Sequence, residues 1–268
     1  MHKCLLFSDL HITAPGETII GLDPSARFSA ALDQALRHHP DARQLLILGD
    51  LTHTGHPQEY ARLRDLLTDC PVPVTATLGN HDDRAAYFSA FPGAARDANG
   101  FAQAALDIGP CRVLLLDTLD ESGVHTRHAG YLCDARLDWL RARLAKAPDR
   151  PTLIAMHHPP VRTGFDGMDR IRLCNDAAFL ALLRAHPQVR QLVCGHVHRA
   201  ISGNHAGLAW SILKSPCHQM PMLLGADGSG HSVDEPGGYA IALLDAETMI
   251  LHAEDVTPAR PVGQSSHS

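Results

Sequence analysis

Residues 44–50 read QLLILGD, five residues typical of a buried strand followed directly by Gly49 and Asp50. The same plan, an apolar run that ends in polar residues, recurs along the chain. The predicted strands are Lys3–Ser8, Gln44–Leu48, Val72–Leu78, Arg112–Leu116, Thr152–Met156 and Val189–Cys194. Apolar runs without polar alternation indicate strands that are buried on both faces.

Segments with helical spacing separate these strands. Helix starts are predicted at Asp23-Pro24, at Pro57, and at the N-caps Asp134 and Asn175. Strands and helices therefore alternate, which predicts an α/β fold built of stacked layers.

The pattern changes after Val197, where helical spacing fades. Antiparallel or edge strands are predicted at Ala200–Ser202, Leu208–Leu213, Tyr239–Leu244 and Met249–Ala253. We expect a single domain over residues 1–256, in which these strands and the loop 225–238 form a cap or a subunit contact. Residues 257–268 are polar and are expected to be a flexible tail.

Composition narrows the class of protein. The chain has 268 residues, 45% of them hydrophobic, and 23 basic against 29 acidic side chains give a net charge of -6. A disordered chain is excluded, and binding to a nucleic acid polymer or a membrane is not expected. Seven scattered cysteines and the lack of a signal-like apolar stretch favour a cytoplasmic protein.

Five of the predicted strands end in possible metal ligands. These are Asp9 and His11, then Asp50, then Asn80, then His157, and finally His196 and His198. Ligands of layered α/β sheets bind outside the carboxyl ends of the strands, so the five loops are expected on one rim. Residues i and i+2 of an extended chain point the same way, so we expect Asp9 with His11, and His196 with His198, to face one side.

Seven donors are too many for one tetrahedral site with an open position. They divide into two sites if one carboxylate bridges. Carboxylate, amide and imidazole donors suit Mn, Fe, Zn or Co. Two such ions roughly 3.5–4 Å apart are a device for in-line displacement at phosphorus.

These motifs resemble the five signature blocks of the calcineurin-like metallophosphoesterases, from Asp9 to His198. The run His157-His158-Pro159-Pro160 and the later Cys217-His218-Gln219 are most similar to the class III cyclic nucleotide phosphodiesterases, a group that includes bacterial glycerophosphodiester phosphodiesterases. The resemblance implies a four-layer α/β/β/α sandwich of the metallo-dependent phosphatase type. It also implies two divalent metal ions per chain, Mn or Fe in the first place and Zn or Co as alternatives.

The resemblance also implies a role for each motif residue. One metal ion would be held by Asp9, His11 and His198, the other by Asn80, His157 and His196, with Asp50 as the bridge. Asn80, His81 and His218 would contact the substrate. Asp50 and His81 are the expected catalytic residues, in a mechanism where a metal-bridging hydroxide attacks phosphorus.

His81 is the motif histidine beside the phosphate. It is a candidate proton donor to the leaving group, oriented by Asp82 or Asp83, and the alternative is that it only hydrogen-bonds the phosphate. The sequence departs from the family at His53, where an acidic residue is frequent.

The substrate is predicted from charge. No Arg or Lys lies inside the five blocks, which favours the single charge of a small phosphodiester, a cyclic nucleotide or a glycerophosphodiester, over a monoester. Arg84, Arg162, Arg170 and Arg172 are expected to be solvated surface charges. The loops 161–173 and 225–238 are expected to wall the entrance.

Other functions stay open at this point. A phosphomonoesterase of the same superfamily, such as a nucleotidase or a protein phosphatase, is the alternative enzyme. A non-catalytic binding module is disfavoured because all seven donors are present. Self-association into a homo-oligomer is a hypothesis that rests on the aliphatic late strands.

Overall fold

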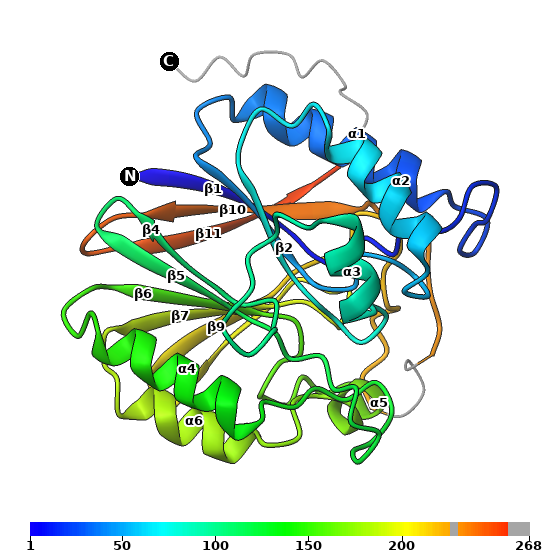
Figure 1. The fold of residues 1–268 in the computed structure, drawn as a ribbon. Helices are drawn as coiled ribbons and strands as arrows, with labels where there is room; N and C mark the ends of the chain where they lie inside the picture. The colour runs from blue at the N-terminus through cyan, green and yellow to red at the C-terminus, as the bar shows by residue number, and fades with distance from the viewer. Residues whose placement is uncertain (226–229, 257–268) are drawn as a thin grey trace, which may run out of the picture.

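Two β-sheets lie face to face in the computed structural model, which describes residues 1–225 and 230–256 (Figure 1). The strands are β1 His2–Phe7, β2 Gln44–Leu48, β3 Val74–Thr77, β4 Ala104–Ile108, β5 Cys111–Leu116, β6 Thr152–Met156, β7 Val189–Cys194, β8 Ile201–His205, β9 Leu208–Ile212, β10 Gly238–Leu244 and β11 Met249–Asp255. The helices are α1 Pro24–His38, α2 Pro57–Leu67, α3 Arg84–Ala90, α4 Asp134–Ala145, α5 Asp166–Arg170 and α6 Asp176–Arg184. The predicted flexible tail, 257–268, lies outside the described residues.

The layers follow from the sheet topology. One sheet has the order β11-β10-β1-β2-β3 and the other the order β4-β5-β6-β7-β9-β8. Helices α1 and α2 cover the outer face of the first sheet, and α4 and α6 cover the second (Figure 1). The prediction of a four-layer α/β/β/α sandwich is therefore confirmed.

Each layer boundary is a hydrophobic core, and β1 shows how the sequence builds it. Leu5 and Phe7 pack under the helices, whereas Cys4 and Leu6 pack between the two sheets. Side chains of a strand alternate between its faces, so a wholly apolar strand is what a sheet covered on both sides requires.

The late strands divide between the two sheets. β10 pairs antiparallel with β1, with Cys4 opposite Ala242, and β11 forms the edge. β9 pairs antiparallel with β8 but parallel with β7, with Leu192 opposite Trp210. β9 is therefore antiparallel to β8, as predicted, but the prediction is wrong for its pairing with β7. After β7 the chain forms the edge strand β8 and then returns, so that β9 lies between β7 and β8.

One predicted helix start is shifted by a residue, and one predicted N-cap does not bond its own helix. Asp23 caps α1 by accepting from the Ser25 amide at 2.9 Å, as expected. The N-cap of α4 is Cys133 instead of Asp134, which is the first helical residue. Asn175 is the N-cap residue of α6, but its side chain does not cap the helix. Instead, its Oδ1 accepts from the backbone N–H of Leu132 and its Nδ2 donates to the carbonyl of Leu132.

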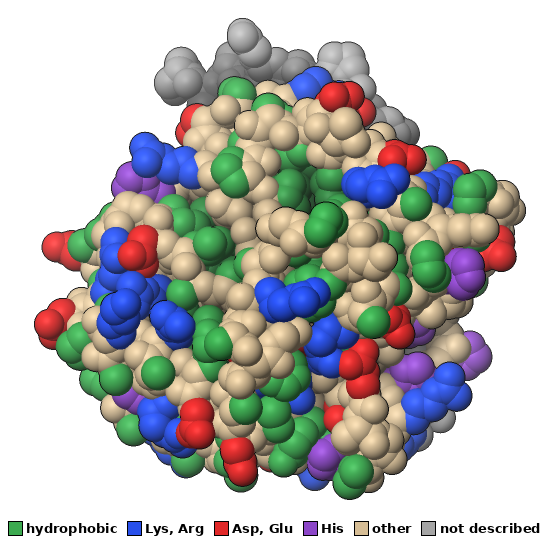
Figure 2. Space-filling view, in the orientation of Figure 1, with side chains coloured by type: hydrophobic (Ala, Val, Ile, Leu, Met, Phe, Trp, Pro, Cys, Tyr) green, Lys and Arg blue, Asp and Glu red, His purple; other side chains and the backbone are tan. Residues whose placement is uncertain are grey.

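The surface carries no dominant charge on the face drawn in Figure 2, where acidic and basic side chains are interspersed. Within residues 1–225 and 230–256, no helix is both long and apolar enough to cross a membrane. All seven cysteines are free thiols.

Candidate metal centre

The carboxyl ends of β1, β2 and β3 meet those of β6 and β7 at one rim of the sandwich. Backbone hydrogen bonds join the loops there. The amide of Asp9 donates to the carbonyl of Gly49 at 3.0 Å, and the amide of Gly195 donates to the carbonyl of His157 at 3.0 Å. These bonds link the β1 and β2 loops in one sheet and the β6 and β7 loops in the other. The amide of His196 donates to Asp9 Oδ1 at 3.0 Å across the two sheets, and the amide of His81 donates to Asp50 Oδ1 at 2.9 Å, so all five predicted loops are brought together.

One group of donors consists of Asp9, His11, Asp50 and His198, all buried, with ligand atoms within 4.8 Å of one another. The Nε2 atoms of His11 and His198 are 3.0 Å apart. His198 Nε2 lies 3.3 Å from Asp9 Oδ1, and His11 Nε2 lies 3.5 Å from Asp50 Oδ2.

A second group surrounds the Nε2 atom of His157. This atom lies 3.2 Å from Asn80 Oδ1, 3.2 Å from His196 Nδ1 and 3.3 Å from Asp50 Oδ2. The same carboxylate oxygen of Asp50 thus borders both groups. That placement is what a bridging ligand between two ions requires.

Two imidazoles are oriented so that Nε2 is the nitrogen available to a metal ion. His157 Nδ1 donates to the carbonyl of Leu48 at 2.8 Å, and His198 Nδ1 donates to the carbonyl of His218 at 3.1 Å. Each bond keeps a proton on Nδ1 and directs Nε2 to the other donors, the arrangement common around metal-ligating histidines. The donor set therefore fits a pair of divalent ions that prefer nitrogen and oxygen.

Charge in the site is unevenly distributed. Burial lowers the pKa of His11 and His196 well below the usual value. Burial opposes the charged form of His157 too, but the Asp50 and Asp9 carboxylates outweigh it and raise its pKa to about 9. For Asp50, burial is outweighed by His157 and His81, which hold its pKa well below the usual value.

The backbone at the donors is left-handed instead of extended. φ is +58° at Asp9, +48° at His11, +76° at His196 and +52° at His198. The prediction that these pairs face one side as alternate residues of an extended segment is therefore wrong. They converge because each residue turns sharply after the strand, a conformation that costs about 1–3 kcal/mol per residue and is concentrated at functional sites.

Two glycines permit this close approach. A Cβ at Gly79 would lie 2.2 Å from Asp50 Oδ1, and one at Gly195 would lie 1.8 Å from Ser8 Oγ. Neither glycine has positive φ. Lack of a side chain, and not backbone freedom, is thus what these two positions need.

His81 lies in the site, but its orientation has a different cause from the predicted one. Its Nδ1 atom donates to the carbonyl of His53 at 2.7 Å, and its backbone amide donates to Asp50 Oδ1 at 2.9 Å. Asp82 and Asp83 bond other groups, so the prediction that one of them orients the imidazole is wrong.

Two further histidines join this region. The ring of His81 stacks between those of His53 and His128, with centroids 5.4 Å from each. His128 Nδ1 accepts from Asn80 Nδ2 at 3.2 Å, which turns Asn80 Oδ1 toward His157. Sequence reasoning missed His128 because it lies in a loop without a motif.

His218 and His158 border the centre from two sides. The ring of His218 is 4.6 Å from that of His198, and burial lowers its pKa to about 3. Its Nδ1 atom is buried with no partner among the described residues. Both nitrogens of His158 are engaged, one with the Thr118 hydroxyl and one with the carbonyl of His128, so His158 supports the centre from behind.

A cavity of about 260 Å³ opens over these side chains. Its walls include Met168 and Ile171 from the loop 161–173, Met220, and His231 from the loop 225–238. Both loops thus border the entrance, as predicted, although residues 226–229 of the second lie outside the described part. An adjoining hollow of about 360 Å³ shares Asn80 and His128 with this cavity.

Two of the four arginines near the motifs are less exposed than predicted, whereas Arg162 and Arg170 are exposed as expected. The Arg84 side chain is only 15% exposed, and its Nε donates to Asp117 Oδ2 at 2.9 Å. Arg172 pairs with Asp176 at 2.7 Å. The prediction of solvated surface charges is therefore wrong for these two, because buried or half-buried carboxylates take up their charge.

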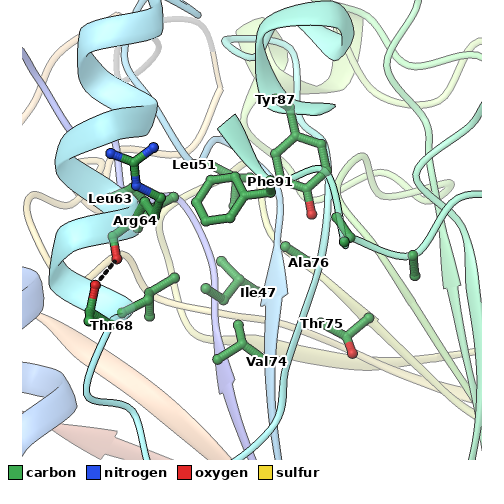
Figure 3. A pocket seen from close by; sticks show the side chains of 14 residues that line it. Ile47, Leu51, Leu63, Arg64, Thr68, Val74, Thr75, Ala76, Tyr87 and Phe91 are labelled. Carbon is green, nitrogen blue, oxygen red and sulfur yellow. Dashed lines mark hydrogen bonds between the residues drawn. The ribbon is translucent and has the colours of Figure 1, made fainter. Parts of the chain in front are cut away.

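A separate apolar pocket of about 340 Å³ is lined by residues of β2, β3, α2 and α3 (Figure 3). Leu63 of α2, Tyr87 of α3 and Ile47 of β2 line it together with Leu51. It contains none of the seven donors. Leu51 therefore has its side chain in this apolar region, although the residue before it lies at the centre.

Comparison with known proteins gives a family and several relatives. Residues 2–200 match the model of the calcineurin-like phosphoesterase family. A probable cyclic nucleotide phosphodiesterase of Rhodopseudomonas palustris is 39% identical, over 93% of this chain and 91% of its own. The 3',5'-cyclic adenosine monophosphate phosphodiesterase CpdA of Pseudomonas aeruginosa is 32% identical, over 93% and 89%. The glycerophosphodiester phosphodiesterase GpdQ of Enterobacter lignolyticus is 31% identical, over 80% and 77%.

Solved structures agree on the fold. A dimetal phosphatase from Danio rerio superposes with a TM-score of 0.71 at 17% identity, covering 96% of both chains. A purple acid phosphatase from yellow lupin gives 0.67 at 13% identity, covering 95% of this chain and 51% of its own.

Proposed function

The chain belongs to the calcineurin-like phosphoesterase family, and on that premise we propose that it hydrolyses small phosphodiesters at a centre of two divalent metal ions. The observation that carries the proposal is the pair of donor groups that share Asp50 Oδ2. Relatives named as cyclic nucleotide and glycerophosphodiester phosphodiesterases support the substrate class.

The residues proposed to hold the ions are the seven donors. Asp9, His11 and His198 would hold one ion, and Asn80, His157 and His196 the other, with Asp50 between them. Mn or Fe is the proposed metal, because the set contains carboxylate, amide and imidazole groups and no thiolate. Such ions supply Lewis acidity, which activates water and neutralises charge on the phosphate.

We assign the leaving-group proton to His81. Its Nδ1–H is committed to the carbonyl of His53, so Nε2 can donate only when the ring is an imidazolium. Nε2 needs the imidazolium form also in the alternative role, in which His81 only donates a hydrogen bond to a phosphate oxygen. Stacking between His53 and His128 fixes the plane in which that donor lies.

The cavity supports a diester over a monoester. No Lys or Arg is among the described residues that line it, so the proposed pair of ions is its main positive charge. A monoester dianion gains more from fixed arginines than a monoanionic diester does. Met168, Ile171 and Met220 supply apolar wall for the organic part of the substrate.

We further propose a class of partner and a cellular location. A site of this size suits small diesters and not a nucleic acid polymer. Seven free thiols are consistent with a reducing compartment, which supports a cytoplasmic location.

A panel of substrates tests the function. Protein reconstituted with Mn²⁺ is assayed with cyclic AMP, a 2',3'-cyclic nucleotide, glycerophosphoethanolamine, bis-p-nitrophenyl phosphate and p-nitrophenyl phosphate. We expect kcat/KM for at least one diester to exceed that for the monoester at least about tenfold, a difference of about 1.4 kcal/mol in transition-state stabilisation. Preference for p-nitrophenyl phosphate would favour the phosphomonoesterase alternative.

A further inference from the structure

The loops that follow β2 and β3 are joined by one buried carboxylate, that of Asp82. Its Oδ2 atom accepts from the amides of Leu51 at 3.1 Å and of Gly79 at 2.9 Å. Its Oδ1 atom accepts from the amide and the hydroxyl of Thr52, both at 3.2 Å. Tyr60 of α2 donates a further hydrogen bond to Oδ1 at 3.0 Å.

The link is reciprocal. Asp82 belongs to the β3 loop and accepts from two amides of the β2 loop, immediately after Asp50. Asp50 belongs to the β2 loop and accepts from the amide of His81 in the β3 loop at 2.9 Å. That second bond uses Asp50 Oδ1 and leaves Oδ2 directed to His11 and His157.

Asp82 itself is not part of either donor group. The described clusters that could hold a metal ion do not contain it, and its carboxylate is occupied by five donors. Its neighbour Asp83 has a different task, since it caps α3 through the amide of Ala86 at 2.7 Å. The two adjacent acidic residues therefore have different roles: Asp82 links the two loops, and Asp83 caps α3.

We propose that Asp82 is a positioning residue, which fixes the β2 and β3 loops to each other and so sets how tightly the ion beside Asn80 is held. The inference rests on the proposed two-metal function. Leu51 strengthens the case, because its side chain lies in the apolar pocket of Figure 3 while its amide, like that of Thr52, ties the β2 loop to Asp82.

The substitution Asp82→Asn tests the proposal with little change of shape. An amide has one acceptor oxygen, and its NH₂ group would face either the amide of Thr52 or those of Leu51 and Gly79. At least one backbone N–H then loses its acceptor whichever way the side chain turns. Loss of a hydrogen-bonding group behind metal ligands typically lowers metal affinity about 10- to 100-fold.

The experiment measures Mn²⁺ binding by calorimetry and by metal analysis after gel filtration, without substrate. We expect Asp82→Asn to bind one ion of the pair about 10- to 100-fold more weakly. The matched control Asp83→Asn makes the same change of charge one residue away and keeps the helix cap, so its affinities should stay within about twofold of wild type. Thr52→Val removes a single donor to Asp82 and should give a smaller loss.

Thermal unfolding of the metal-free proteins separates positioning from general support. Wild-type metal affinities for Asp82→Asn, whether or not its Tm is lowered, would overturn the proposal. If Asp82→Asn does not fold, wild-type affinities for Thr52→Val would overturn it instead. Because no substrate is involved, wild-type protein that binds two ions but hydrolyses no diester would refute the proposed function and leave this inference intact.

Discussion

Five of the seven donor residues hold their side chains in place with a left-handed backbone, Asp50 being the fifth with φ of +47°. Such strain persists only where the surroundings over-determine it. Here the surroundings are the hydrogen bonds between loops and the absence of side chains at Gly79 and Gly195. The geometry of the centre thus depends in part on residues, such as Gly79 and Gly195, that are not themselves metal ligands.

The substitution Gly79→Ala should therefore disturb the centre although no donor is lost. The new Cβ would lie 2.2 Å from Asp50 Oδ1 and 2.5 Å from its amide, so the bridging carboxylate must move. We expect weaker Mn²⁺ binding and a Tm lowered by several degrees. Gly93→Ala is the matched control, because its Cβ would meet nothing within 4 Å. Equal metal affinity in both variants would contradict this explanation.

The substitution Asp50→Ala removes the one side chain that borders both donor groups. We expect turnover of bis-p-nitrophenyl phosphate to be abolished and at least one metal position to be empty, measured by assay and by metal analysis. Asp65→Ala removes an exposed acid on α2 and serves as the control. Full turnover by Asp50→Ala with unchanged metal content would refute the bridging role.

At this scale the sequence was informative about donors and poor about their supports. Strand ends followed by Asp, Asn or His identified the residues that the structure brings together. The support of His81 by the carbonyl of His53, and of Asn80 by His128, could not be predicted. A backbone carbonyl leaves no mark in sequence, and His128 comes from a loop whose path depends on the whole fold.

Among the elements, α1 shows how a local signal becomes a stable helix. Asp23 caps it, and the same carboxylate pairs with Arg62 of α2 at 3.1 Å. We expect Asp23→Ala to destabilise the protein by about 1 kcal/mol, which corresponds to a Tm lower by about 2–4 °C. Asp23→Asn keeps the cap and loses only a partly exposed ion pair, so it should lower Tm less. Equal losses in thermal unfolding would show that the ion pair dominates.

Elements that sequence reasoning missed are short or poorly patterned. β4 reads AALDI, of which only the two end residues are buried, so it lacks the continuous buried run of strands such as β2 and β6. α3 and α5 have seven and five residues, too few for a helical repeat to be recognised. The strands β2 and β6 were predicted to the residue because they are buried and continuous in sequence, and β7 was predicted to the residue although Arg190 in it is exposed.

For the whole molecule, the donors divide between the two sheets. Asp9, His11, Asp50 and Asn80 follow strands of the first sheet, and the others follow strands of the second. Ions bound there would join the two halves of the sandwich. At a free concentration a hundredfold above Kd, one ion stabilises the native state by about 2.7 kcal/mol.

Removal of metal should accordingly lower the Tm of the whole domain, and Mn²⁺ should restore it in proportion to the logarithm of its concentration. Differential scanning calorimetry with and without a chelator measures the change. Asp50→Ala should respond much less than wild type. A Tm indifferent to chelator in the wild-type protein would show that the sheets are held together without help from ions.

The pairing of β1 with β10 has a consequence for biosynthesis. β1 is made well before β10, one of its two neighbours in the sheet, which follows almost all the other described strands and helices. Until then the nascent chain exposes an apolar strand with one open edge, ready to pair with a wrong partner. The first sheet can therefore be completed only after β10 has been made, and until then its open edge is exposed to wrong pairing.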